Sequence, residues 1–304
     1  MNRYLSSIGF SHIDGKKQLK CLLNSVIASP DREVILPGRN DGEFCKLAVL
    51  ETGEDTGLGV YGTVDSSGAF ETEYYYPYID SHFCSTVAEC SVEKQTEKEA
   101  WSGICDDHRL GMNLIFFVLN AMDYRKRESA GGMAPNIYGV CLSGLAVNGK
   151  VLLPVYKTED QIRIQEKQEL RSEELMDAAM NGDQEAMDEL TYDDMNTYSS
   201  VSTRLEKTDI YSVVETFILP GGVECDQYTI MGYIISVSSN INPLTGEKIY
   251  ILEVVSNQIP MRLAISADEL MGVPAVGYRF KADIWLQGSV IMDFPSGQMN
   301  IVLK

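Results

Sequence analysis

The 304-residue sequence lacks an apolar stretch long enough to cross a membrane, and its N-terminus lacks an apolar run of signal-peptide length. The longest apolar run lies around residues 114–119, far short of the roughly 20 residues of a transmembrane helix. Polar residues interrupt the first ten positions, so nothing there marks the chain for export. We therefore expect a cytoplasmic protein with no membrane partner.

Basic residues are scarce as well. The chain has 25 Lys and Arg against 44 Asp and Glu, which gives a net charge of −19. A field of this sign repels phosphate backbones and anionic membranes, and it favours cationic partners, so nucleic acid is not the expected ligand. More than half of this net negative charge lies in residues 159–209, which have fifteen acidic and five basic side chains. This segment is either a solvated acidic surface docked on a neighbouring domain or an arm that binds a basic protein.

Residues that hold metals or perform catalysis are few and scattered. Seven cysteines form no Cys-x-x-Cys pair, which argues against a disulfide framework and a zinc site, and indicates buried free thiols. His12, His82 and His108 lack the spacing that brings two ring nitrogens to one metal. Asp106-Asp107-His108 is the only local cluster of acids with an imidazole, and the charged start of a helix explains it. We expect no cofactor, no metal and no recognisable catalytic residue.

A glycine-rich stretch, Gly57-Leu-Gly-Val-Tyr-Gly-Thr-Val64, fits the patterns of both dinucleotide-binding and kinase loops. A dinucleotide site needs a helix to follow the third glycine, whereas residues 63–70 have the pattern of a strand and a turn. A kinase needs a lysine on the following strand, and no lysine occurs between Val64 and Glu93. The stretch therefore indicates a glycine-rich hairpin or bulge.

The first 157 residues are predicted to form an α+β domain with an antiparallel sheet. Apolar residues at helical spacing predict a helix over 16–28. Short β-like runs between residues 44 and 92 predict the sheet, and the tyrosine-rich run 74–78 is interpreted as core and edge packing within one strand. A second helix is expected from about residue 106 to 127. Strands at 137–147 and 151–155 then follow, joined by a hairpin turn at Asn148-Gly149. Residues 158–209 are predicted to be an acidic helical connector.

Residues 210–304 carry the clearest architectural pattern. A long strand at 226–238 turns into a second strand at 248–255, and a third strand at 261–265 leads through a capping box at Ser266 into a short helix. A fourth strand covers 277–290. This order is typical of an OB-like small β-barrel, a fold that often binds oligonucleotides.

The fourth strand raises the question of a binding platform. Alternation places Tyr278, Phe280, Ala282, Ile284 and Leu286 inside the barrel and leaves Trp285 outside, on the same side as two cations. Rings that stack on bases beside cations that follow phosphates are what a single-strand binder needs. Burial of Trp285 against the connector or the first domain is the preferred interpretation, because the surrounding region is acidic. The candidate binding residues are Arg262, Arg279, Lys281 and Trp285.

The chain resembles an uncharacterised family, catalogued as a domain of unknown function in Gram-positive anaerobes. The resemblance rests on residues 1–10, on Val223-Glu-Cys-Asp-Gln-Tyr228 and on Arg279-Phe-Lys-Ala-Asp-Ile-Trp-Leu-Gln-Gly288. It implies a bacterial cytoplasmic protein and supplies no activity. The leading hypothesis is a non-enzymatic interaction or scaffold protein whose acidic surface receives a basic protein. The alternatives are an OB-fold binder of single-stranded nucleic acid and an enzyme whose residues converge from distant segments.

Overall fold

A computed structural model describes residues 2–38, 42–95, 100–155, 158–192, 210–222 and 224–293. These residues form two compact units. Residues 1–152 and 216–304 make up the first unit, and residues 153–215 make up the second. Part of the predicted connector, residues 193–209, lies outside the described ranges.

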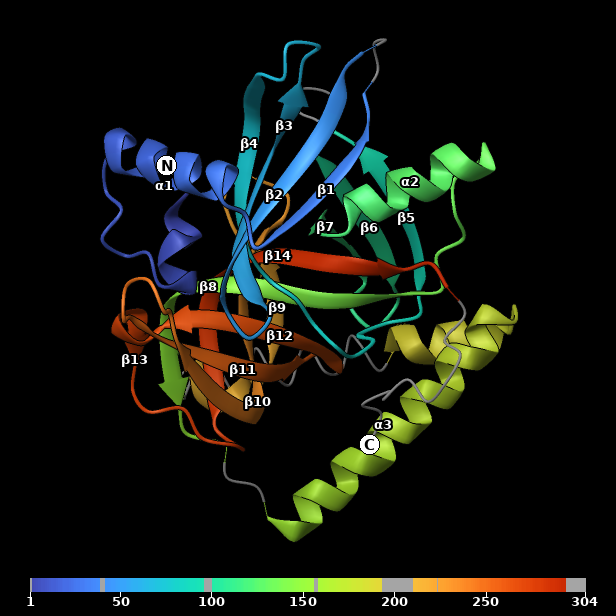
Figure 1. Cartoon of the computed structure of the whole chain (residues 1–304). Helices are drawn as coiled ribbons and strands as arrows, with labels where there is room; N and C mark the ends of the chain where they lie inside the picture. The colour runs from blue at the N-terminus through green and yellow to red at the C-terminus, as the bar shows by residue number, and fades with distance from the viewer. Residues whose placement is uncertain are drawn as a thin grey trace. The chain divides into compact units, whose positions relative to one another are not determined.

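The core of the first unit is a closed five-strand barrel (Figure 1). Four of its strands follow the predicted order: β10 (Gln227–Ile241), β11 (Lys248–Ser256), β12 (Ile259–Ser266) and β14 (Arg279–Ile291). The fifth is β8 (Gly139–Leu152), which pairs in parallel with β12 and antiparallel with β14. The predicted fold class, α+β with an antiparallel sheet and an OB-like barrel, is confirmed.

Strand β8 differs from its prediction. Instead of two strands joined by a hairpin turn, residues 139–152 form one continuous strand, so the predicted turn at Asn148-Gly149 is wrong. Asn148 has a φ of 56°, the left-handed conformation that such a turn also uses. Here that conformation accompanies a register shift opposite Lys281 and Asp283 of β14, so it marks a bulge within the strand. The division into three domains stays a prediction. The barrel sheet contains strands from the predicted first and third domains.

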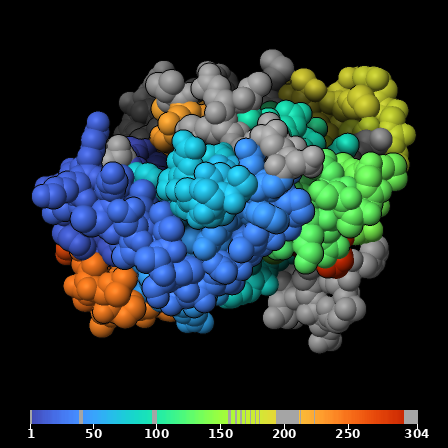
Figure 2. Space-filling view, turned by 45° about the horizontal axis from the view of Figure 1, so that its top comes forward, coloured from blue at the N-terminus to red at the C-terminus, as the bar shows by residue number. Residues whose placement is uncertain are grey.

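Sheet A is the predicted antiparallel sheet. Its order is β1 (Arg32–Pro37), β2 (Phe44–Gly53), β3 (Thr56–Val64) and β4 (Phe70–Ile79), and the glycine-rich stretch lies within β3. Helix α1 (Lys16–Ala28) has the predicted bounds and packs against β2 and β3, with Val26 fully buried. Figure 2 shows α1 in blue on the same surface as residues of sheet A in blue to cyan.

The region expected to be a second helix is mostly a hairpin. Strands β5 (Glu89–Lys94), β6 (Trp101–Asp107) and β7 (Met112–Val118) extend the barrel sheet, and β7 joins it through a short parallel pairing with β14. Gly111, with a φ of 63°, closes the tight turn between β6 and β7. Only α2 (Ala121–Gly131) is helical, so the prediction of helix from residue 106 is wrong up to residue 118.

Short elements complete the first unit. The 3-10 helix η1 (Arg3–Ile8) contacts β8 and β12, and β9 (Phe217–Pro220) pairs with β10. Ser266 caps η2 (Ala267–Glu269), as predicted, by accepting a hydrogen bond from the backbone N of Asp268. The two-residue strand β13 (Leu270–Met271) then pairs with β8.

Two apolar cores fill the first unit. One lies inside the barrel, and it includes four of the five residues that were predicted to point inward. The prediction is wrong for Tyr278, which is 36% exposed, because it lies in the turn before β14, where the alternation of a strand does not apply. The other contains residues of η1, α1 and sheet A together with outward-facing residues of β8, β11 and β14. The outer face of the barrel is therefore covered at these residues by other parts of the same chain.

The described part of the second unit is mostly helical. Helix α3 (Glu159–Met180) is followed by a turn at Gly182, a helix over residues 184–192, and the short α5 (Ile210–Val213). Asp183 caps the second helix by accepting bonds from the backbone N of Glu185 and of Ala186. An ion pair between Arg171 and Glu189 links α3 to that helix. Among the described residues of the chain, no helix is both long and apolar enough to span a bilayer.

Candidate functional site

Trp285 lies on the outer face of the barrel but is covered, with only 9% of its surface exposed. Its ring packs between Tyr4 of η1 and Phe117 of β7, at centroid distances of 6.0 and 5.2 Å. Its Nε1 donates a hydrogen bond to Asp226 Oδ2 at 2.7 Å. The indole is thus packed on both sides and hydrogen-bonded, which agrees with the predicted burial against the first domain.

Arg262, on β12, also faces outward from the barrel and is buried. Its Nη1 lies 2.7 Å from Asp55 Oδ2 in the turn between β2 and β3, and His82 Nε2 approaches the same carboxylate oxygen at 2.6 Å. The contact with Asp55 is an ion pair without hydrogen-bond alignment, because neither Nε nor Nη1 of Arg262 has a hydrogen-bond partner. The buried hydroxyl of Ser143, the neighbour of Arg262 across the β12–β8 pair, is also unpaired.

Gln287 of β14 is the neighbour of Ser143 on the other side of β8, and it is fully buried. Its side chain accepts a bond from the backbone N of Ile79 and donates one to Pro77 O, which fastens the end of β4 to the barrel. His82, which contacts Asp55 beside Arg262, has 62% of its side-chain surface exposed. No described contact joins His82 to a nucleophilic side chain, so the cluster has an oriented imidazole without a reacting partner.

The two remaining candidates on β14 differ in exposure. Arg279 is buried and Lys281 is half-buried, and both interact with other groups of the chain. The four predicted binding residues therefore lie on two barrel strands that β8 separates, and they share no open platform. A binding role for them stays a prediction, and their burial gives it no support.

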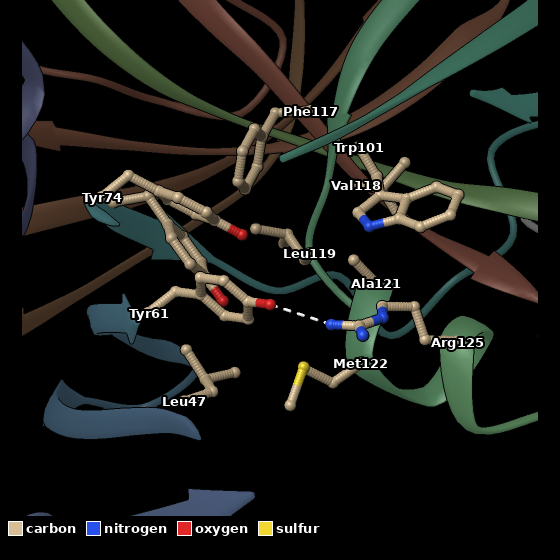
Figure 3. A pocket seen from close by; sticks show the side chains of 11 residues that line it. Leu47, Tyr61, Tyr74, Trp101, Phe117, Val118, Leu119, Ala121, Met122 and Arg125 are labelled. Atoms are coloured by element: carbon tan, nitrogen blue, oxygen red, sulfur yellow. Dashed lines mark hydrogen bonds between the residues drawn. The ribbon is translucent and has the colours of Figure 1, made fainter. Parts of the chain in front are cut away.

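An aromatic pocket lies where sheet A, the β6–β7 hairpin and α2 meet (Figure 3). Tyr61 and Tyr74 stack at 4.9 Å, and Phe117 lies beside Tyr76 at the same centroid distance. This accounts for the tyrosine-rich run of β4, which contributes core and edge packing as predicted. The other lining residues are Leu47, Trp101, Val118, Leu119, Ala121, Met122 and Arg125.

Arg125 and Trp101 bring nitrogen donors to this pocket. Arg125 Nη1 donates a hydrogen bond to the Tyr61 hydroxyl at 2.8 Å, drawn as a dashed line in Figure 3. The Nε1 of Trp101 is buried and has no partner. The cavity measures only about 10 Å³, about the space of one water molecule. As it stands, the pocket can hold a water on the indole N–H but not an organic ligand.

The acid cluster at residues 106–108 does not start a helix, as was predicted, but lies at the end of β6 and in the turn that follows. Asp107 ends β6 with 1% of its side chain exposed, and Arg109 binds both of its carboxylate oxygens, at 2.8 and 2.6 Å. Thr86 donates a third bond at 2.6 Å, and Arg109 also donates to Gln258 O. Burial acts to raise the pKa of Asp107, but the bonds from Arg109 and Thr86 outweigh it and lower the pKa to about 2. His108 is exposed and takes no part in this network.

The cysteines divide by exposure, and all seven are free. Cys21 and Cys225 are exposed, whereas Cys45, Cys84 and Cys105 are buried. Burial raises the pKa of Cys105 to about 11, and it raises those of the half-buried Cys90 and Cys141 to about 12.

Because the thiolate is the reactive form, two thiols should react quickly with a disulfide reagent in the folded protein and all seven after unfolding. The measurement is the time course of thionitrobenzoate release in buffer and in denaturant. A Cys21→Ser/Cys225→Ser variant should show no fast phase. Fast reaction of a third thiol in that variant would contradict the assignment.

No group of three metal-binding side chains occurs among the described residues. A family model described as "Domain of unknown function, E. rectale Gene description (DUF3881)" matches residues 5–288. Comparisons with curated proteins and with solved structures give no match.

Proposed function

The chain belongs to this DUF3881 family of domains of unknown function, and from its geometry we propose a cytoplasmic, non-enzymatic interaction protein that binds a basic protein partner through its acidic helical unit. The observation that carries the proposal is the concentration of charge in a separate unit. Residues 159–209 hold fifteen acidic side chains against five basic ones. Such a segment attracts a basic surface and speeds the encounter with it.

The described part of this unit combines charge with exposed apolar groups. Glu174, Glu185 and Asp188 are exposed, and so are Ile164 and Leu170, at 56% and 61%. Apolar contacts inside a charged rim are typical of protein interfaces, where the charges guide association and the apolar groups give affinity. Nucleic acid is not part of the proposal, because the surplus acids repel phosphates and the indole of Trp285 is covered.

The test neutralises three acids of this unit in the full chain. A Glu174→Gln/Glu185→Gln/Asp188→Asn variant should lose at least about tenfold in affinity for its partner at low salt. The matched control neutralises three exposed acids of the first unit, as Glu54→Gln/Glu71→Gln/Glu89→Gln, and has the same net charge. Both variants and the parent are used as bait in an E. rectale lysate, and the captured basic protein is purified and titrated against all three.

We expect the partner to bind the parent and the control equally well. Equal loss in both variants would attribute binding to total charge rather than to the helical unit. If both variants kept the affinity of the parent, the acids of the helical unit would not be the binding site and the proposal would be wrong. Raising the salt concentration should weaken binding to the parent, because salt screens exposed charges.

A further inference from the structure

An open groove is lined by residues of η1, of the bend in β8 and of the segment from η2 to β13. Its volume is about 700 Å³, within the range of about 300–1,000 Å³ typical of ligand sites. The aromatic pocket, at about 10 Å³, has no comparable room. Of these two cavities, the groove is the one that admits an organic ligand without rearrangement.

The walls of the groove carry charges of opposite sign. Arg3 lies on the η1 side, where the Tyr4 hydroxyl and Gln227 Oε1 accept bonds from its Nη2 at 2.7 and 3.3 Å. Its guanidinium also lies over the Tyr4 ring, 4.8 Å from the centroid, so the cation is held in place. Asp268 and Glu269 lie on the η2 side.

Lys150 adds a second cation, from the β8 bend. Within the described ranges of the chain, no ion pair engages Lys150, Asp268 or Glu269. Two carboxylates and an ammonium group thus remain available to a ligand.

An apolar floor and lip complete the groove. Val147 and Leu270 line it, and Met271 stands at its edge with 68% of its surface exposed. Beyond Met271, the loop toward β14 exposes Val273 at 78% and Val276 at 64%. Neighbouring exposed apolar side chains beside a cavity commonly mark a surface that binds another molecule.

We propose that this groove binds a short zwitterionic peptide, two to four residues long, with an apolar side chain. The peptide carboxylate lies against Arg3 and Lys150, the peptide ammonium against Asp268 and Glu269, and the apolar side chain on Leu270 and Met271. A purely anionic ligand would leave the two carboxylates without a counter-charge, and a purely cationic one would leave the two cations without one. A phosphate would in addition be repelled by the two carboxylates. This inference is independent of the helical unit and of the basic partner proposed for it.

The experiment is calorimetric titration of the full chain with alanyl-leucyl-alanine and three blocked forms of it. One form is acetylated and lacks the ammonium, one is amidated and lacks the carboxylate, and one is blocked at both ends. We expect the zwitterion to bind best and each single block to weaken binding about tenfold. Absence of binding by the zwitterion at about 10 mM would overturn the proposal, and so would equal binding of all four forms.

Variants assign each end of the peptide to its wall. In an Asp268→Asn/Glu269→Gln variant, acetylation should no longer matter, whereas amidation should still weaken binding. A Lys150→Gln variant should respond less to amidation and fully to acetylation. The matched control, Glu54→Gln/Glu71→Gln, should behave as the parent does. If acetylation weakened binding equally in the parent and in the acid-wall variant, the assignment of the ammonium would be wrong.

Discussion

Asp107→Asn is expected to lower the free energy of unfolding by about 2–4 kcal/mol at neutral pH, one of the largest single-site effects in this chain. The amide keeps the shape of the side chain but removes the charge that Arg109 binds through two hydrogen bonds. The guanidinium, with only 21% of its side chain exposed, would then be partly buried without its counterion. We place the effect toward the lower end of values for buried pairs, because that exposure lets water reach Arg109.

Urea unfolding measures this effect, and Asp106→Asn is the matched control. Asp106 is the exposed neighbour on the same strand, so its replacement should change the free energy of unfolding by less than about 0.5 kcal/mol. An equal effect at both positions would show that the strand end, rather than the ion pair, is sensitive. A double variant that also lacks Arg109 should lose less stability than the two single losses added together.

The same pair sets part of the response to acid. The pKa of Asp107 is about 2 in the folded chain and about 3.9 in an unfolded one, so its charge stabilises the fold above pH 4. That contribution is lost as the pH falls from about 4 toward 2, where the folded state must also take up the proton. The Asp107→Asn variant should therefore lose less stability than the parent between pH 4 and pH 2.

The sequence predicted those elements whose local pattern is sufficient. Helix 16–28 and the four strands of the barrel follow from spacing, turns and one cap, and the structure has them at nearly the expected bounds. Strand β8 was expected over residues 137–147, but its place in the barrel was not predicted, because it precedes the other four strands by a whole helical unit and its pairing is non-local. Periodicity identifies strands but does not say which strand closes a barrel.

Two errors have a physical reason of the same kind. Leu110, Leu114, Phe117 and Val118 fit helical spacing, yet the β-branched and aromatic run at residues 115–118 pairs as a strand once the turn at Gly111 forms. Asn148-Gly149 offers the left-handed conformation of a hairpin turn, and the chain uses it for a bulge. In both places tertiary pairing decides between two local structures that the residues permit.

The candidate site shows the same limit. Alternation correctly placed Trp285 outside the barrel, but no local signal says that η1 and β7 cover it. The contact of Arg262 with Asp55 and the bond of Thr86 to Asp107 join side chains that are far apart in the sequence. The excess of acids, by contrast, is a property of composition, so the proposal of a basic partner could be made from the sequence.

Trp285→Ala is the second substitution with a large expected effect, a loss of about 3–5 kcal/mol in the free energy of unfolding. The indole fills the space between Tyr4 and Phe117 on the covered face of the barrel, and alanine would leave a cavity there. Trp285→Phe should cost less, about 1–3 kcal/mol, mainly through loss of the bond to the Asp226 carboxylate.

Trp101→Phe is the matched comparison, because its Nε1 is buried without a partner and the substitution removes an unpaired donor. It should cost less than Trp285→Phe, as measured by urea unfolding. It also leaves Trp285 as the only tryptophan, since the chain has two. The fluorescence of this variant should resist acrylamide and should not change with single-stranded oligonucleotides at low salt. Strong quenching by an oligonucleotide would mean that the indole can leave its packing for base stacking, and the nucleic-acid hypothesis would then displace the protein partner proposed above.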